Sequence, residues 1–457
     1  MSAGVIVICA VAVLLLLIVV EVPVGLALAV SGIFGSVLLE GWPVASDVLS
    51  TTPYYASARY ALFVIPMFVL LGALVANAGI GAQIFTAVNK VVGRVPGGLP
   101  ATTVLATAAF SGISGSSAAD VAAFGRISVQ EMTRKGYSPN YAAAVVAAAG
   151  AFAALIPPSI VLVVFAITAD ISVGSMILAG VLPGLFSAAV LAGYVVARTI
   201  WSRRGSPAEA HDSPVDLTRD APEDAEFARY QQSRRGSLIG ALYAVLLFAI
   251  VIGGIQTGLF TSTEAGAVGA FAALLLTLVV KRPKHLTRWA VVARSLKETS
   301  SITSMVFLLL VGAAIFNYFL ISARVPSDVA AWVAGLDLPA HIVLLLILLL
   351  LLPLGTVLDG LSMVLVVTPI VVPIVNELGF DPIWYGILLI KMTEIALITP
   401  PVGINVFVIA GIMKATKVEQ IFRSVFPFVL LDLAVTAVLF AFPSIITWLP
   451  SIATPAG

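Results

Sequence analysis

The stretch that decides the fold is Ile398-Thr399-Pro400-Pro401-Val402-Gly403-Ile404-Asn405, which has a shorter counterpart in Ile156-Pro157-Pro158-Ser159. Each stretch interrupts an apolar segment that is long enough to form a membrane-spanning helix. Proline has no amide hydrogen, so adjacent prolines leave carbonyl groups of the preceding turn without helical partners. Inside a membrane those carbonyl groups must find other partners, because no water reaches them. The sequence therefore predicts two broken helices.

The composition places these helices in a membrane. Of the 457 residues, 60% are apolar and only 10% are charged, whereas soluble domains carry roughly 25% charged residues. Apolar runs of about 20 residues, the length that crosses a membrane, recur along the chain. We therefore expect an all-α polytopic membrane protein, and neither a soluble enzyme nor a nucleic-acid-binding protein. The single cysteine, Cys9, can form no intrachain disulfide.

Two pairs of shorter apolar runs are predicted to form re-entrant hairpins. These pairs are 97–112 with 117–131, and 340–354 with 359–376. We expect each run to be too short to cross a hydrocarbon core about 30 Å thick, and each pair meets at a polar tip that contains glycine. The longer apolar runs, which we expect to span the membrane, lie near 4–20, 23–39, 60–79, 140–168, 174–199, 238–255, 263–280, 299–320, 382–412 and 424–448.

Basic residues give the predicted orientation. A hairpin returns to the side from which it entered, a full span does not, and short loops rich in Lys and Arg stay in the cytoplasm. Following the chain on this rule places 20 of the 24 basic residues on the cytoplasmic side, the exceptions being Arg59, Arg126, Arg324 and Lys391. Both termini are then outside. The charged segment 201–236 is predicted to be a solvated cytoplasmic loop.

The two halves of the chain match in register. An offset of 243 residues places Gly136-Tyr137 on Gly379-Phe380, Pro139 on Pro382, and the first Pro-Pro pair on the second. Each unit holds a hairpin, a broken span and a final span, and the charge pattern makes the two broken spans run in opposite directions. Such inverted repeats are typical of secondary transporters, whose substrate and ion sites lie where broken helices and hairpin tips meet.

The first hairpin tip, Ser111 to Asp120, combines glycines with serine hydroxyls. Small residues allow a sharp turn, and hydroxyl and freed carbonyl oxygens are ligands for a hard cation. The helix that starts after Ser117 also points its positive dipole end at the tip, which favours an anion. Packing of small residues against a neighbouring helix is the alternative interpretation.

Each tip is paired with the break of its own repeat, which gives two predicted cation sites. The second tip is Gly355-Thr356-Val357-Leu358-Asp359-Gly360. For a single Pro-Pro pair, an ordinary kink satisfied by neighbouring helices is the alternative; two pairs at equivalent positions favour the sites. The candidate cation ligands are Ser114, Ser116, Ile156, Pro157, Gly355, Thr356, Asp359, Thr399 and Val402.

Charged residues at membrane depth are costly and therefore indicate function. Lys391 and Glu394 lie three residues apart on one predicted helix, where they can simply neutralise each other. Asp120 and Asp359 lie near the starts of hairpin helices, where helix capping is the alternative to an ion site. Glu264 follows three hydroxyl residues at a helix start and is predicted to be a cap.

A catalytic role is not expected. Gly112-Ile113-Ser114-Gly115 matches the GxSG pattern of intramembrane serine proteases, but a serine nucleophile needs a base within hydrogen-bond reach. His211 and His285 lie in predicted cytoplasmic segments, and His341 lies at the outer mouth of the second hairpin. The chain also lacks a G-x-x-x-x-G-K-[ST] loop, so ATP is not expected as a direct energy source.

Over nearly its whole length, the sequence resembles the large membrane subunit of tripartite ATP-independent periplasmic (TRAP) transporters. The resemblance is carried by Ile65 to Gly72, Ser111 to Gly125, Gly136-Tyr137, Ile156 to Ser159, Pro183-Gly184, Gly379 to Pro382 and Ile398 to Phe407. It implies an elevator-type ion-transporter fold, in which a transport domain of hairpins and broken helices moves against a fixed scaffold. It also implies sodium coupling, a periplasmic binding protein that delivers the substrate, and a separate small four-helix membrane subunit.

The resemblance divides the chain into domains. The expected transport segments are 81–173 and 339–415. The expected scaffold segments are 1–80, 174–325 and 416–457, and 326–338 is predicted to be a helix that lies on the outer membrane interface.

The implied substrate is an organic acid, and much of the choice among organic acids is expected to lie with the binding protein. The candidate substrate-binding residues are Ser114, Ser116, Ser117, Ser159 and Asn405. The implied location is the bacterial inner membrane. The alternative function is a stand-alone sodium/divalent-anion symporter of a related elevator fold, which would need no binding protein.

Overall fold

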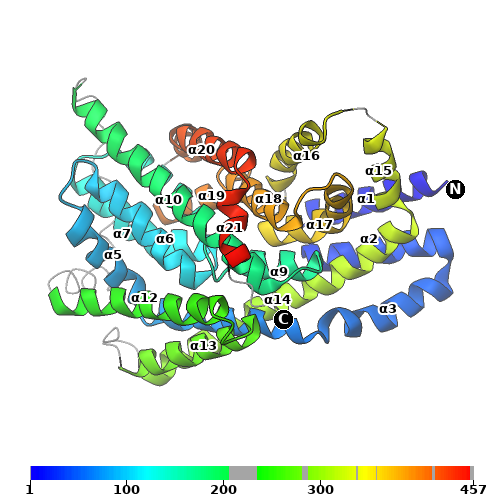
Figure 1. Cartoon of the computed structure of the whole chain (residues 1–457), viewed down its shortest axis with the longest axis horizontal. Coiled ribbons are helices and arrows are strands. Elements are labelled where there is room, and N and C mark those ends of the chain that lie inside the picture. The colour runs from blue at the N-terminus through cyan, green and yellow to red at the C-terminus, as the bar shows by residue number, and fades with distance from the viewer. Residues whose placement is uncertain are drawn as a thin grey trace.

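The protein is described from a computed structural model that covers residues 2–204, 234–279, 287–335, 338–356, 358–413 and 417–452. Every regular element in these ranges is a helix (Figure 1). Six helices are long and apolar enough to cross a membrane, and several shorter apolar helices accompany them. The all-α polytopic fold predicted from the composition is therefore confirmed. Most of the predicted loop 201–236 lies outside the described residues, as do His211, His285, Val357 and Gly457.

The two repeat units contain a hairpin, a broken helix and a long following helix in the same order, and each has one further short helix without a counterpart. The first unit consists of α6 (Gly98–Ser114), α7 (Ser117–Arg134), α8 (Pro139–Gly150), η2 (Ala151–Ala154), α9 (Ile160–Thr168) and α10 (Val173–Arg204). The second consists of α16 (Ala340–Gly355), α17 (Gly360–Glu377), α18 (Pro382–Ala396), α19 (Ile404–Met413), α20 (Val418–Ala441) and α21 (Ser444–Ile452). Both broken helices are interrupted at the Pro-Pro pairs, as predicted.

The turn that joins each hairpin to its broken helix has the same geometry in both units. Gly136 and Gly379 adopt left-handed conformations, with φ of +86° and +76°. The backbone amides of Tyr137 and Phe380 donate to the carbonyl group five residues earlier, at 3.1 and 3.0 Å. A capping side chain and a proline at the first helical position then start the next helix in both units. This helix stop needs glycine, because only glycine adopts the left-handed conformation without strain.

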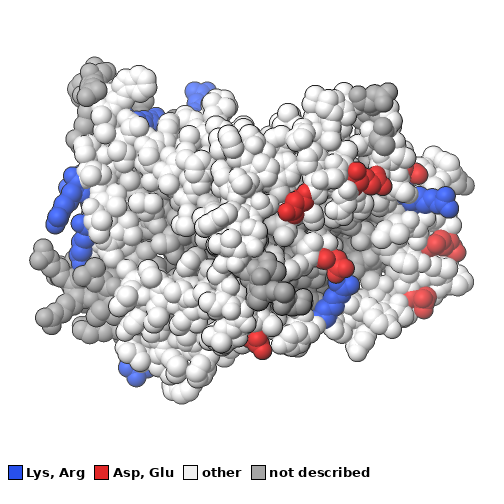
Figure 2. Space-filling model, in the orientation of Figure 1, with Lys and Arg blue, Asp and Glu red and all other residues white. Residues whose placement is uncertain are grey.

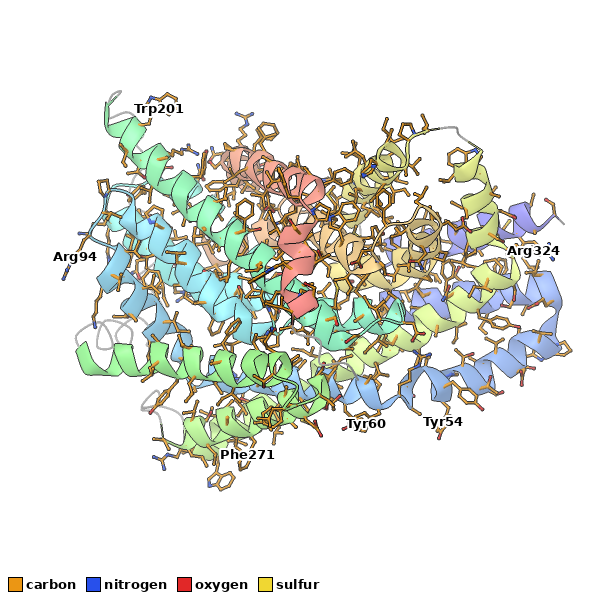
Figure 3. All side chains as sticks on the ribbon, viewed as in Figure 1. Tyr54, Tyr60, Arg94, Trp201, Phe271 and Arg324 are labelled. Carbon is orange, nitrogen blue, oxygen red and sulfur yellow. The ribbon has the colours of Figure 1, made fainter. Side chains whose placement is uncertain are left out.

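The two hairpins lie toward opposite ends of the molecule. In Figure 1, α6 and α7 extend from the left edge to the centre, whereas α16 and α17 lie in the right half. Arg94, which precedes α6, is at the left edge of Figure 3, and Arg324, which precedes α15, is at the right edge. On the face shown in Figure 2, the left end carries basic side chains and no acidic ones, whereas the centre and right half carry acidic side chains together with some basic ones. The arrangement agrees with repeats of opposite orientation.

Two features differ from the predicted spans. Helix α17 is itself long and apolar enough to cross a membrane, so its place in a hairpin rests on its packing with α16 and α18 and not on its length. The predicted final span 424–448 is divided, because α20 ends at Ala441 and α21 begins at Ser444, just after Pro443. Proline supplies no amide hydrogen to continue α20, and its fixed φ suits the start of α21.

The remaining helices pack mainly on one another. They are α1 (Ala3–Val19), α2 (Val24–Glu40), α3 (Trp42–Ser57), η1 (Tyr60–Phe63), α4 (Val64–Asn77), α5 (Ile80–Val92), α12 (Arg234–Gln256), α13 (Ser262–Val279), α14 (Arg288–Ser322) and α15 (Val325–Ala334). Helices α3 and α5 were not among the predicted elements. Helix α3 carries polar residues and Pro53 within its length, and α5 is amphipathic, so neither shows a continuous apolar run.

The long helix α14 is the centre of this group. Its 35 residues extend about 52 Å at 1.5 Å per residue, and it contacts α2, α3, α4 and α13. At the crossing with α2, a Cβ atom built on Gly312 would lie 1.8 Å from the carbonyl oxygen of Gly25. A Cβ atom on Gly25 would lie 2.8 Å from backbone atoms of Leu308. The backbones thus approach too closely for any side chain, a packing mode typical of membrane helices.

We predict that Gly312→Ala lowers the thermal stability of the purified protein. The added methyl group must push α2 away from α14, and overpacking of this kind costs about 1–3 kcal/mol. The control is Gly253→Ala on α12, where a Cβ atom would meet nothing within 4 Å. That variant should be neutral or slightly stabilising, because alanine is the better helix former. Equal melting temperatures for the two variants would contradict the close crossing.

Candidate functional site

The first hairpin tip is closed by a buried carboxylate. The hydroxyl groups of Ser111 and Ser114, at the end of α6, both donate to the carboxylate of Asp120 in the first turn of α7. Asp120 is completely buried. The N-cap of α7 is Ser116, whose hydroxyl accepts a bond from the amide of Ala119 at 3.4 Å. Asp120 therefore joins the two arms of the hairpin, and the capping role considered for it belongs to Ser116.

The first tip lies directly against the first break. A Cβ atom on Gly112 would lie 3.1 Å from the carbonyl oxygen of Pro157, and one on Gly115 would lie 3.1 Å from that of Pro158. Gly115 also has a left-handed φ of +62°, which ends α6. On the other side, a Cβ atom on Gly72 of α4 would lie within 2.8 Å of the carbonyl oxygens of the tip. The glycines thus let carbonyl groups of the tip and of the break come together.

The second tip has a different polar arrangement. Asp359 caps α17 by accepting bonds from the amides of Leu361 and Ser362, at 3.0 and 3.1 Å, and from the Ser362 hydroxyl. These contacts are those of a helix cap, the alternative considered for Asp359. The Thr356 hydroxyl donates to the carbonyl oxygen of Pro353 at 2.8 Å. A Cβ atom on Gly355 would lie 2.7 Å from Ala396, so this tip lies against the helix end that precedes the second break.

The hydroxyl groups of the two breaks donate hydrogen bonds to backbone carbonyl oxygens nearby in the sequence. Ser159 is fully buried; its hydroxyl donates to the carbonyl oxygen of Ala154 at 2.6 Å and caps α9. The Thr399 hydroxyl donates to the carbonyl oxygen of Ile395 at 2.6 Å, which leaves the lone pairs of the hydroxyl oxygen available as an acceptor. Val402 is 40% exposed, so the second break reaches the surface of the chain.

Asn405 connects the two repeats. Its side-chain amide donates to the carbonyl oxygen of Ala147 on α8 at 3.1 Å, and the residue is fully buried. The Asn405 Oδ1 atom has no hydrogen-bond partner among the described residues. On the same side, a Cβ atom on Gly125 of α7 would lie 2.7 Å from Ile409. The half-helix α19 of the second repeat is therefore packed against α7 and α8 of the first.

The structure thus brings some of the predicted residues together and separates others. Ser114 and Ser116 lie at the tip whose glycines contact the Ile156–Pro158 break, while Gly355 and Thr356 lie with Thr399 near the end of α18. Ser117, at the start of α7, is half-buried. Carbonyl and hydroxyl oxygens are the donor set that suits a hard monovalent or divalent cation. The pairing of Asp120 with Ser111 was not predicted, because only closure of the hairpin makes these residues neighbours.

We predict that Asn405→Ala destabilises the contact between the repeats. The variant removes a buried hydrogen bond and leaves the Ala147 carbonyl group without this donor, which costs about 1–3 kcal/mol. Asn376→Ala, at an exposed position on α17, is the control and should leave the melting temperature unchanged. A melting temperature of Asn405→Ala that equals that of the control would show that the bond to α8 contributes nothing.

Comparison with known proteins gives a consistent picture. The family model described as the tripartite ATP-independent periplasmic transporter, DctM component, matches residues 11–445. The C4-dicarboxylate TRAP transporter large permease protein DctM of Pseudomonas aeruginosa is 34% identical over 428 residues, which cover 93% of this chain and 92% of that protein. The 2,3-diketo-L-gulonate TRAP transporter large permease protein YiaN of Escherichia coli is 32% identical, with coverage of 92% and 94%.

A solved structure has the same fold. The YdaH transporter of Alcanivorax borkumensis, described as having an unusual topology, matches with a TM-score of 0.62 and 15% sequence identity. The match covers 88% of this chain and 89% of that one. At this identity the match indicates a common fold.

Proposed function

The chain belongs to the DctM component family of tripartite ATP-independent periplasmic transporters, and from this premise we propose that it carries an organic acid into the cell together with sodium, whose downhill entry drives the uptake. It is a large permease subunit and not one of the soluble components. The observation that carries the proposal is the pair of repeat units in which a hairpin tip packs on a Pro-Pro break, in the first unit, or on the helix end that precedes the break, in the second. Each unit offers carbonyl and hydroxyl oxygens at one place.

Sodium is the coupling ion that this donor set supports. Neutral oxygens in an unwound backbone replace the hydration shell of a hard cation. In the first unit the oxygens come from Ser114, Ser116, Ile156 and Pro157, and in the second from Gly355, Thr356, Thr399 and Val402. Asp359 supplies a carboxylate to the second site, although its oxygens also cap α17. We propose one sodium ion in each unit.

The substrate is proposed to bind between the tips. The names of two relatives specify a C4-dicarboxylate and 2,3-diketo-L-gulonate, and both substrates carry carboxylate groups. Ser116 and Ser117 lie at the N-terminal end of α7, where amide groups and the helix dipole favour an anion, and Ser114 lies at the adjoining end of α6. Ser159 and Asn405 are fully buried and already bonded. We therefore propose that these two residues position the breaks that face the substrate.

An elevator movement is proposed to carry the site across the membrane. Helices α10 and α20 were expected in the scaffold, but α10 contacts α6, α9 and α18, and α20 contacts α8, α18 and α19. We therefore group α10 and α20 with the hairpins in the moving domain. The proposed scaffold consists of α1–α5 and α12–α14; it includes α5, which was expected in the transport segment 81–173 and contacts α6 as well as α12. Helix α15, over most of the predicted interfacial segment, contacts both α14 and α17.

The other components are proposed to be those of the family. A small four-helix membrane subunit would complete the membrane complex, and a periplasmic binding protein would deliver the substrate. The proposed location is the bacterial inner membrane, with both termini in the periplasm. On the face shown in Figure 2, the left end carries basic side chains without acidic ones, which supports this orientation under the positive-inside rule.

We predict that uptake requires both a sodium gradient and the binding protein. The permease with its small subunit should be reconstituted in liposomes and supplied with binding protein and labelled organic acid. An inward sodium gradient should drive uptake, and an equal potassium gradient should not. Uptake that persists in potassium would exclude sodium coupling. Strong uptake without the binding protein would instead support the stand-alone symporter.

Substitutions at Ser116 and Thr399 separate ion binding from helix capping. Ser116→Gly should cost only a few tenths of a kcal/mol in capping, but it removes a hydroxyl ligand. We predict that the sodium concentration for half-maximal uptake rises about tenfold, equivalent to about 1.4 kcal/mol. Thr399→Val should have the same effect at the second site. Ser116→Thr and Thr399→Ser keep the hydroxyl groups and serve as controls; sodium dependence unchanged in all four variants would leave only backbone ligands.

A further inference from the structure

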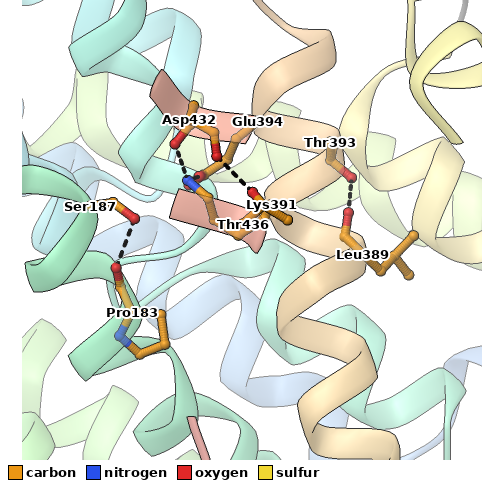
Figure 4. A network of polar contacts seen from close by, with 8 residues as sticks. All are labelled: Pro183, Ser187, Leu389, Lys391, Thr393, Glu394, Asp432 and Thr436. Atoms are coloured by element: carbon orange, nitrogen blue, oxygen red, sulfur yellow. Dashed lines mark hydrogen bonds and ion pairs between the residues drawn. The ribbon is translucent and has the colours of Figure 1, made fainter. Parts of the chain in front are cut away.

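Three charged side chains meet inside the protein, away from the hairpin tips. The Lys391 ammonium group on α18 contacts Glu394 of the same helix at 2.7 Å and Asp432 of α20 at 2.6 Å. Lys391 and Glu394 are completely buried, and the Asp432 side chain is 17% exposed. Figure 4 shows Lys391 between the two carboxylates. Lys391 and Glu394 therefore do not simply neutralise each other, because the fold brings a third charged group, Asp432, against Lys391.

The cluster contains two acidic groups and only one basic group. With both carboxylates ionised, one ammonium group faces two negative charges, so the cluster carries a net charge of −1. Two carboxylate oxygens that contact the same nitrogen lie no more than 5.3 Å apart, the sum of the two contact distances. An uncompensated charge in a region of low dielectric constant is costly, and such a group usually becomes neutral instead.

The geometry also shows an unoccupied position on Glu394. Its Oε2 atom accepts the bond from Lys391, whereas its Oε1 atom is buried and has no hydrogen-bond partner within the described part of the chain. A buried carboxylate oxygen without a donor is rare in folded proteins. On α20, Asp432 itself accepts from Lys391, and the Thr436 hydroxyl donates to the backbone carbonyl oxygen of Asp432 at 2.8 Å, so neither residue donates to Oε1.

Other charged groups around α18 do not provide the missing charge. The helices packed on α18 include α9, α10, α16, α17, α20 and α21. Of their described charged side chains, Arg198 lies over the Tyr141 ring and His341 contacts Phe380 and Phe440. Glu377, Glu419 and Arg423 are exposed. The charges that act on Glu394 are those of Lys391 and Asp432.

A small pocket adjoins the cluster. Asp432 lines it together with Ser187 of α10, Phe152 of η2 and Ile398 at the start of the second break. The Ser187 hydroxyl is bonded to the carbonyl oxygen of Pro183 at 2.8 Å (Figure 4). The less buried carboxylate therefore faces a small space between the first and second repeats.

We propose that the Lys391–Glu394–Asp432 cluster is a proton-binding site, in which one proton resides on Glu394 Oε1 while Oε2 continues to accept from Lys391. Binding converts the Glu394 carboxylate to a carboxylic acid and makes the cluster neutral. Release of the proton returns one negative charge to the contact between α18 and α20. The broken helix α18 is thereby coupled to pH through a site that is separate from the proposed sodium sites.

Infrared difference spectroscopy between high and neutral pH tests the proposal on the full-length protein in lipid, without any transport assay. In an Asp120→Asn background, which removes the other completely buried carboxyl group, the protein should show the C=O stretch of a protonated carboxyl group at neutral pH, and adding Glu394→Gln should abolish the band. Asp432→Asn should also abolish it, because the remaining carboxylate then pairs with Lys391 one to one. Lys391→Met should add a second band, since neither carboxylate then has a counter-charge.

The control in the same background is Glu419→Gln, at an exposed position on the same helix as Asp432, which should keep the band. Glu394→Gln preserves the shape of the side chain. If this variant fails to fold, Asp432→Asn is the second variant that should abolish the C=O band. Absence of the band in the Asp120→Asn background, or a band there that survives both removals, would overturn the proposal. The result does not depend on sodium coupling or on the identity of the substrate, so it can fail while the proposed function holds.

Discussion

The structure depends on one constraint, which is that every backbone carbonyl group at membrane depth needs a partner. Two Pro-Pro pairs interrupt α8–α9 and α18–α19 and thereby remove helical hydrogen bonds in the interior of the protein. The hairpins provide the surroundings in which these interruptions are tolerated. Gly112 and Gly115 bring the first tip onto the first break, and Asn405 of the second break donates to a carbonyl group of α8. The breaks, the tips and the contact between the repeats are therefore one arrangement.

Much of this arrangement could be predicted from the sequence, because its signals are local. A Pro-Pro pair breaks a helix in any surroundings, and a glycine followed by an aromatic residue, a capping residue and a proline ends one helix and starts the next. The offset of 243 residues then related Gly136 to Gly379, and both residues adopt the same left-handed turn in the structure. Fold class and repeat organisation follow from such signals.

Other features could not be predicted, because they arise only on folding. Asp432 lies 41 residues from Lys391 in sequence, and nothing in either segment indicates that α20 crosses α18 at that point. The bonds from Ser111 and Ser114 to Asp120 likewise depend on closure of the hairpin. Helix α3 was missed for another reason: it shows no continuous apolar run. The packing of α10 and α20 with the hairpins was also not predicted, because the expected scaffold and transport segments were drawn along the chain and not from contacts between helices.

The central claim is that the two repeats are inverted, so that their hairpins open to opposite sides of the membrane. Arg94 and Glu377 are exposed residues at the open ends of the first and second hairpins. In a Cys9→Ser background, single substitutions Arg94→Cys and Glu377→Cys can be tested with a membrane-impermeant maleimide in intact cells. Inverted repeats predict that position 377 is labelled from outside, and that position 94 is labelled only after the membrane is permeabilised. Labelling of both positions from the same side would contradict the inverted repeat.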